Sequence, residues 1–148
     1  MIDSKPRANA PTPERFERIG VVADPHTAAR TRDEFARWLQ SAFDLDPDRE
    51  SAFVLAIYEA LANTAEFAYP SAGLPGTMDV SAFYDATESA LSVTVSDRGL
   101  WRTAAPFPGD RSRGRGIALM KALADDASIQ TSTVGTTVRL AWTGVHRL

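Results

Sequence analysis

The stretch Glu59-Ala-Leu-Ala-Asn63 lies inside the most apolar periodic run of the chain. Two later stretches accompany it, Asp97-Arg-Gly-Leu-Trp101 and Gly114-Arg-Gly-Ile-Ala-Leu-Met120. The first stretch supplies an amide one helical turn from a carboxylate. The second supplies an aspartate at the end of a predicted strand, and the third supplies two glycines at the start of a predicted helix. Together these groups have the chemistry to hold a nucleoside triphosphate and its magnesium ion. The order and spacing carry this interpretation, because each piece alone is a weak signal.

The first stretch places two polar side chains on one side of a predicted helix, residues 47–68. Residues four apart stack on a helix, so Glu59 and Asn63 share a face. An amide oxygen suits the hard cation Mg²⁺, which makes Asn63 a candidate metal ligand. A carboxylate one turn earlier can accept a proton, which makes Glu59 a candidate catalytic base. A polar edge on an amphipathic helix is the alternative. The predicted core stripe of this helix consists of Phe53, Ile57, Ala60, Leu61 and Thr64.

The second stretch follows an alternating apolar run and contains Asp97 and Gly99. A carboxylate at a strand end can accept a hydrogen bond from the exocyclic amine of a base. Gly99 has no Cβ, so a planar base can approach the backbone there. An ordinary Asp-x-Gly turn would have the same residues.

The third stretch places Gly114 and Gly116 at the start of a predicted helix, residues 114–123. Glycines before a helix N-terminus leave backbone N–H groups for phosphate oxygens, and the helix dipole assists. The loop predicted for residues 98–113 and the start of the helix are rich in positive charge, which can screen a polyphosphate. A solvated loop with scattered charge is the alternative. The arginines of this region are Arg98, Arg102, Arg111, Arg113 and Arg115.

Composition narrows the class of protein. The chain has 148 residues, 44% of them hydrophobic and 24% charged, as expected of one ordinary globular domain. The net charge of −3 argues against direct nucleic-acid binding, which needs a basic surface. No apolar run is long enough for a membrane span or resembles a signal peptide. The chain contains no cysteine, which excludes disulfides and thiol nucleophiles and fits the cytoplasm.

The pattern of elements predicts the fold class. We expect a flexible tail over residues 1–14 and one domain over residues 15–148. Strand patterns cover residues 16–22, 78–84, 91–96, 128–133 and 136–142, and helix patterns cover residues 26–43, 47–68 and 114–123. Asp46 and Pro47 predict the capped start of the second helix. This order predicts a two-layer α/β sandwich, with a mixed, mostly antiparallel sheet and helices on one face.

Taken together, the stretches resemble a known fold. Their order resembles the Bergerat ATP-binding fold of the GHKL group, which includes histidine kinases and gyrase. More closely, it resembles the small bacterial anti-sigma-factor serine/threonine kinases of partner-switching systems. The resemblance covers about residues 16–142. It rests on residues 56–69, 95–101 and 113–125, and on Gly135-Thr-Thr-Val-Arg-Leu140, which is similar to the last strand of the family.

The resemblance implies roles for these residues. Asn63 would hold Mg²⁺, and Glu59 would act as general base toward a serine or threonine hydroxyl of a partner protein. Asp97 would accept a hydrogen bond from the amino group of adenine, and Gly99 would lie beneath the base. The implied cofactors are ATP and Mg²⁺. The residues that the resemblance assigns to nucleotide binding are Asn63, Asp97, Gly99, Arg113, Gly114, Arg115, Gly116 and Thr137.

The implied partners are a STAS-type anti-sigma-factor antagonist, a sigma factor and a second copy of the chain, with no nucleic acid or membrane. Two departures from the family pattern motivate a second hypothesis. Phe67 stands where many relatives have histidine, and Trp101 replaces the second glycine of the usual Asp-x-Gly-x-Gly motif. The alternative is therefore a regulatory module that binds nucleotide with weak or no catalysis. The catalytic domain of a histidine kinase fits less well, because 148 residues leave no room for a phospho-acceptor hairpin.

Overall fold

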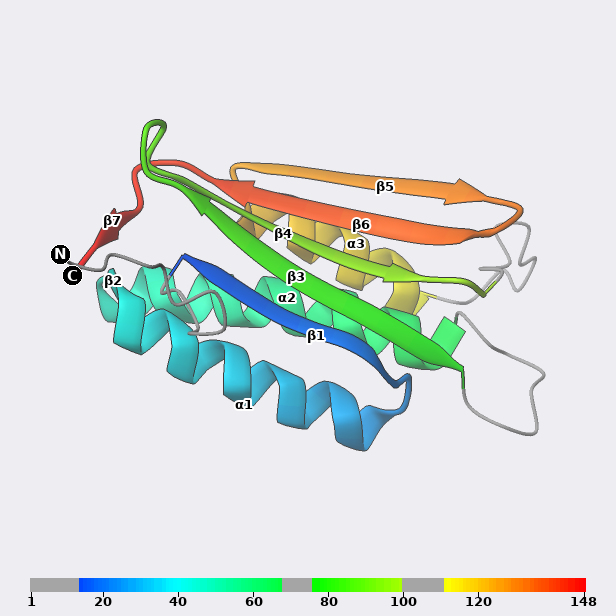
Figure 1. The fold of residues 1–148 in the computed structure, drawn as a ribbon. Helices are drawn as coiled ribbons and strands as arrows, with labels where there is room; N and C mark the ends of the chain where they lie inside the picture. Colours follow the sequence, from blue (N-terminus) through cyan, green and yellow to red (C-terminus); the bar gives the residue numbers. More distant parts are fainter. Residues whose placement is uncertain (1–13, 68–75, 100–110) are drawn as a thin grey trace, which may run out of the picture.

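The computed structural model describes residues 14–67, 76–99 and 111–148. They form two layers, a five-stranded sheet and three helices that cover one of its faces (Figure 1). The predicted tail lies almost wholly outside these residues, as does most of the predicted loop before the last helix. The elements are β1 (Arg15–Val22), α1 (Pro25–Ala42), β2 (Phe43–Asp44), α2 (Pro47–Phe67), β3 (Thr77–Asp85), β4 (Ala90–Asp97), α3 (Arg111–Leu123), β5 (Asp126–Ser132), β6 (Gly135–Trp142) and β7 (His146–Arg147).

The sheet has the order β1-β3-β4-β6-β5, and all its neighbouring strands are antiparallel. The central strands β3, β4 and β6 alternate between buried and more exposed positions, because successive side chains point to opposite faces. In β4 the buried positions are Leu91, Val93, Val95 and Asp97. These face the helices, so the predicted α/β sandwich with helices on one face is confirmed. No helix in the described parts of the chain is long and apolar enough to cross a membrane.

Helices α1 and α2 each begin after a capping aspartate. Asp24 precedes Pro25 and accepts a hydrogen bond from the backbone N–H of Thr27 at 2.7 Å. This bond holds the pKa of the Asp24 carboxyl below its ordinary value. Asp46 likewise accepts from the backbone N–H of Arg49 at 2.9 Å, so the predicted start of α2 is confirmed. The predicted core stripe of α2 is also confirmed, since all five of its members are buried.

Two features differ from the expectation. The short strands β2 and β7 pair with each other in a separate ribbon. Strands of two residues are too short to show any periodicity in sequence. Helix α3 begins at Arg111, three residues before the predicted start at Gly114. The two glycines therefore lie inside the helix, where packing of α3 on α2 offsets their low helix propensity.

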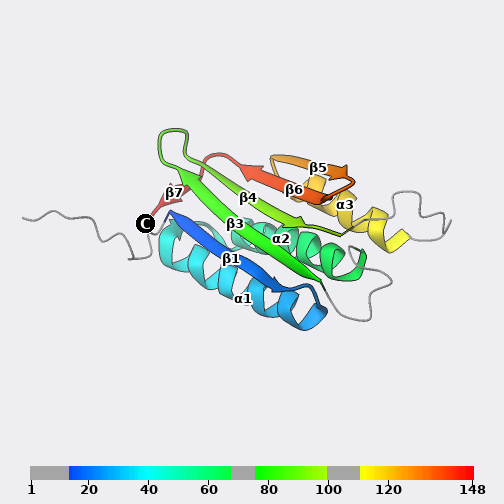
Figure 2. The same cartoon turned by 45° about the vertical axis from the view of Figure 1, so that its right-hand side comes forward.

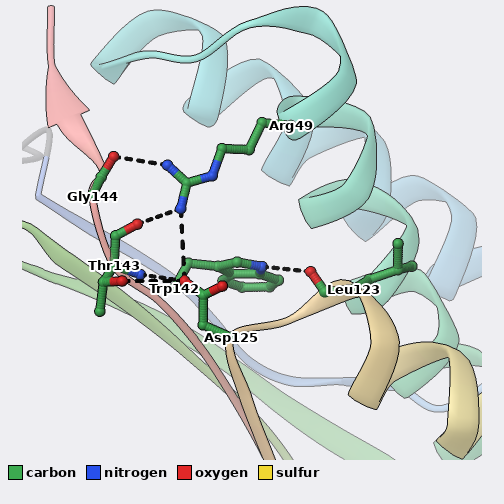
Figure 3. A network of polar contacts seen from close by, with 6 residues as sticks. All are labelled: Arg49, Leu123, Asp125, Trp142, Thr143 and Gly144. Atoms are coloured by element: carbon green, nitrogen blue, oxygen red, sulfur yellow. Dashed lines mark hydrogen bonds and ion pairs between the residues drawn. The ribbon is translucent and has the colours of Figure 1, made fainter.

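A polar network ties three elements together at one end of the molecule (Figure 3). Arg49, near the start of α2, donates to the carbonyl oxygens of Thr143 and Gly144. Its guanidinium also lies 3.7 Å from the Asp125 carboxylate, which accepts from the backbone N–H of Thr143 at 2.8 Å. Trp142 donates its indole N–H to the last carbonyl of α3 at 2.9 Å. The start of α2 and the ends of α3 and β6 are thereby fixed, and their opposite ends meet at the other end of the sheet.

Candidate functional site

Four elements meet at the end of the molecule opposite this network. These are the last turns of α2, the first turns of α3, the end of β4 and the start of β6, at the right of the views in Figures 1 and 2. The three sequence motifs lie on α2, β4 and α3. The fold therefore brings together segments that are tens of residues apart in the chain.

Glu59, Asn63 and Gly116 lie against one another at this end. A Cβ built on Gly116 would be 2.9 Å from Oε1 of Glu59 and 3.1 Å from Nδ2 of Asn63. Only a glycine lets α3 approach both side chains so closely. Asn63 is 6% exposed, and its Nδ2 has no hydrogen-bond partner among the described residues. A buried amide without partners is costly, so this side chain is suited to a polar ligand.

Asp97 is held at the end of β4 by two backbone groups. It is 7% exposed, and its Oδ1 accepts from the N–H of Gly99 at 2.9 Å and from the N–H of Thr136 at 3.4 Å. A carboxylate can accept about four hydrogen bonds, so an anchored carboxylate can still accept from a base. The predicted Asp97–Gly99 turn therefore orients the carboxylate on the helix-facing side of the sheet.

Gly135 is responsible for the close approach of β6 to Asp97. Its φ is +147°, and a Cβ built there would lie 1.9 Å from the carbonyl oxygen of Asp97. The next residue, Thr136, pairs with Asp97 across the strands. Its side chain is 1% exposed, and its hydroxyl has no partner among the residues that the structure describes. Thr136 is not among the site residues predicted from the sequence, although strand alternation places it on the same face of the sheet as Asp97.

Thr137 is among the predicted site residues, but it follows Thr136 in the strand and is only partly buried. It lines a hollow of about 360 Å³ beside the turn between β5 and β6, and Asp97 lines the same hollow. Glu59 and Asn63 do not line it. The other lining residues are Gln130, Thr131, Ser132, Val134 and Gly135.

The start of α3 differs from the prediction that Gly114 and Gly116 precede the helix and offer free backbone N–H groups to phosphate oxygens. Because the helix begins at Arg111, the N–H of Gly116 is bonded within the helix, and the free N–H groups belong to its first residues. The side chains of Arg113 and Arg115 lie outside the described part of the structure, as do residues Trp101 and Arg102 and the side chain of Phe67. Arg98 is described, and its guanidinium lies 3.7 Å from the Asp79 carboxylate.

Comparison with known proteins points to one family. The model of the histidine kinase-like ATPase domain matches residues 21–142 of this chain. That range contains every motif described above.

A solved structure agrees with this match. The crystal structure of the RsbU and RsbW domains of Rv1364c from Mycobacterium tuberculosis superposes with a TM-score of 0.67 and 26% sequence identity. The match covers 90% of this chain and 33% of that one, so the present chain spans about a third of the length of the chain in that crystal structure.

Proposed function

Because the chain belongs to the family of histidine kinase-like ATPase domains, we propose that it is a protein kinase that transfers the γ-phosphate of ATP to a serine or threonine. The observation that carries this proposal is the contact of Glu59 and Asn63 with Gly116, at the end of the sheet where Asp97 lies. A candidate general base, a candidate metal ligand and a carboxylate that can bind adenine thus lie at the same end of the domain.

Asp97 and Asn63 divide the binding of the nucleotide between them. The Asp97 carboxylate accepts a hydrogen bond from the N6 amine of adenine, and the backbone of Gly99 lies beneath the adenine ring. The amide oxygen of Asn63 provides the kind of ligand that Mg²⁺ prefers. When bound, the ion neutralises charge on the phosphates. The buried, unpartnered Nδ2 of Asn63 can at the same time donate to a phosphate oxygen of the nucleotide, which would offset the cost of its burial.

Glu59 would take the proton in the transfer step. The substrate hydroxyl oxygen forms a bond to the γ-phosphorus while the bond from that phosphorus to the β,γ-bridging oxygen breaks. ADP leaves, and the hydroxyl proton moves to the Glu59 carboxylate. Positioning and charge neutralisation supply most of the acceleration in such transfers, and a general base adds about 10²–10⁴-fold.

The Glu59→Gln variant is expected to reduce phosphate transfer by about 10²–10⁴-fold and to leave ATP affinity within about threefold, since glutamine keeps the shape and removes the base. Transfer of radiolabelled phosphate to a purified STAS-type candidate substrate measures the first effect, and calorimetry with Mg-ATP measures the second. Glu66→Gln, an exposed position on the same helix, is the matched control. Transfer at the parental rate by the Glu59 variant would remove the general-base role of Glu59, and absence of transfer to any serine or threonine partner by the parent protein would remove the enzyme claim. ATP binding without transfer by the parent protein would favour the alternative, a regulatory nucleotide-binding module.

The Gly116→Ala variant is expected to keep or slightly raise stability, by up to about 1 kcal/mol, because alanine is the better helix former. Its Cβ would displace the ends of the Glu59 and Asn63 side chains, so ATP affinity should fall about tenfold or more. Thermal unfolding and calorimetry on one preparation separate the two effects. Ala118→Gly, at an exposed position of α3, provides the inverse control, with lower stability and unchanged affinity. An unchanged ATP affinity in Gly116→Ala would show that the close contact of α3 with Glu59 and Asn63 is not needed for nucleotide binding.

The proposal also includes partners. The resemblance to anti-sigma-factor kinases and the match to a structure that contains an RsbW domain support a partner-switching role in the cytoplasm. In this role the domain forms a homodimer, sequesters a sigma factor and phosphorylates the antagonist that releases it. Light scattering on the purified chain tests the dimer. Co-purification with candidate sigma factors, with and without Mg-ATP, tests the sequestration.

A further inference from the structure

One face of the five-stranded sheet is left open by the helices, because α1, α2 and α3 all cover the other face (Figures 1 and 2). Cross-strand partners point to the same side of a sheet, so the register of the strands fixes which side chains share the open face. In the middle of this face, on β3, β4 and β6, most of these side chains are small and uncharged. They are Ser81, Ser92, Thr94, Ser96, Thr137 and Ala141. Small side chains leave the sheet flat enough for a second sheet to pack about 10 Å away.

Two larger apolar side chains lie on the same face. Phe83 on β3 is 48% exposed, and Val22 on β1 is 42% exposed. Their cross-strand partners Ser92 and Thr77 also point away from the helices. Strands of about seven residues in a five-stranded sheet span roughly 20 Å by 24 Å at the backbone, and the side chains enlarge this area. The open face thus approaches the size of about 800 Å² that one partner buries in a stable interface.

A row of side chains across this face has opposite charges at its two ends. It begins with Glu17 on β1, continues through Ser81 and Thr94, and ends with Arg139 on β6. Both charged residues are exposed. They are three strands apart, about 14 Å, which is too far for an ion pair within one chain. Because the hydroxyls between them are neutral, the row is complementary to a copy of itself that runs in the opposite direction.

The next row of the face has the opposite order of charges. It begins with the exposed Arg15 on β1, passes Phe83 on β3, and reaches the exposed Asp126 on the edge strand β5. Arg15 also lies 3.7 Å from Glu17 of its own strand. Each side of the open face therefore carries one acid and one base, Glu17 with Arg15 on one side and Arg139 with Asp126 on the other. Neither side repels the opposite side of a second copy.

We propose that this open face binds a second copy of the chain, sheet against sheet, about a twofold axis that runs parallel to the strands between β3 and β4. This rotation places β1 of each copy over β6 of the other. Glu17 then faces Arg139 of the second copy, and the same contact occurs twice. Phe83 lies over Ser92 of the second copy, where small side chains leave room for its ring. The inference rests on the homodimer of the proposed function and names the surface that forms it.

Sedimentation velocity over a concentration series measures the dissociation constant of the dimer. Arg139→Glu would place two carboxylates opposite each other twice per dimer, so we expect dimerisation to weaken at least about tenfold. Glu17→Arg would oppose two guanidinium groups and should have a similar effect. The double variant restores opposite charges and should dimerise within about threefold of the parent. Arg37→Glu, at an exposed position of α1 with the same change of charge, should not alter dimerisation.

Three outcomes would overturn the inference. The first is a parent protein that stays monomeric, and loss of its sigma-factor binding in Arg139→Glu would then assign the open face to that partner. The second is a dimer that neither single reversal weakens, which would place the homodimer on another surface. The third is a double variant that dimerises as weakly as the single variants. Circular dichroism on each variant verifies folding. ATP binding and phosphate transfer by the parent test the kinase proposal separately, because neither measurement depends on where the dimer forms.

Discussion

The Gly135→Ala variant is expected to lose about 3 kcal/mol or more of its unfolding free energy and to bind ATP poorly or not at all. The alanine Cβ would lie 1.9 Å from the carbonyl oxygen of Asp97, a backbone atom that cannot rotate away. The φ of +147° adds strain for any side chain. Relief requires β6 to move away from β4, which would break the pairing of Thr136 with Asp97. The substitution is therefore expected to lower both the unfolding free energy and the affinity for ATP.

Urea unfolding followed by circular dichroism measures the loss, and Gly20→Ala provides the matched control. Gly20 also has a positive φ, +69°, but a Cβ there would meet no atom within 4 Å. Its replacement should cost about 1–2 kcal/mol, from backbone strain alone, and should leave ATP binding intact. Equal losses of stability in the two variants would show that the collision with Asp97 is relieved at little cost. The close approach of the two strands would then not be essential.

The helices and central strands could be predicted because their signals are local. The stripe from Phe53 to Thr64 has the helical period, and Asp24 and Asp46 cap helices where the chain needs them. The start of α3 could not be predicted in this way. Its helical turns before Gly116 depend on packing against α2, which only the folded chain provides. The ribbon of β2 and β7 joins residues about a hundred apart, and its two-residue strands have no pattern of their own.

The candidate site likewise contains features that follow from local sequence and features that depend on the packing of distant segments. Glu59, Asn63 and Asp97 were predictable, because spacing on a helix and position at a strand end are sequence properties. The contact of Gly116 with Glu59 and Asn63 was not, since it depends on how two helices pack. Thr136 is an intermediate case. Strand alternation puts it on the helix-facing side, but only the pairing of β4 with β6 shows that its partner is Asp97.

The Asp97→Asn variant is expected to bind ATP at least about 100-fold more weakly than the parent while remaining folded. The amide oxygen of asparagine can still accept from the N–H groups of Gly99 and Thr136, so the turn is kept. The amide NH₂ would replace the second carboxylate oxygen and place a donor against the N6 amine of adenine. Two opposed donors in a buried site cost far more than one missing hydrogen bond.

The same substitution should change which base is preferred, because an amide NH₂ can donate to O6 of guanine. Calorimetry with ATP and GTP on parent and variant therefore tests the base-binding role apart from stability. The ratio of ATP to GTP affinity should fall by more than about tenfold. Asp126→Asn, at an exposed position of β5, should change neither affinity. An Asp97→Asn protein that keeps its ATP affinity within about threefold would mean that the adenine amine is bound elsewhere.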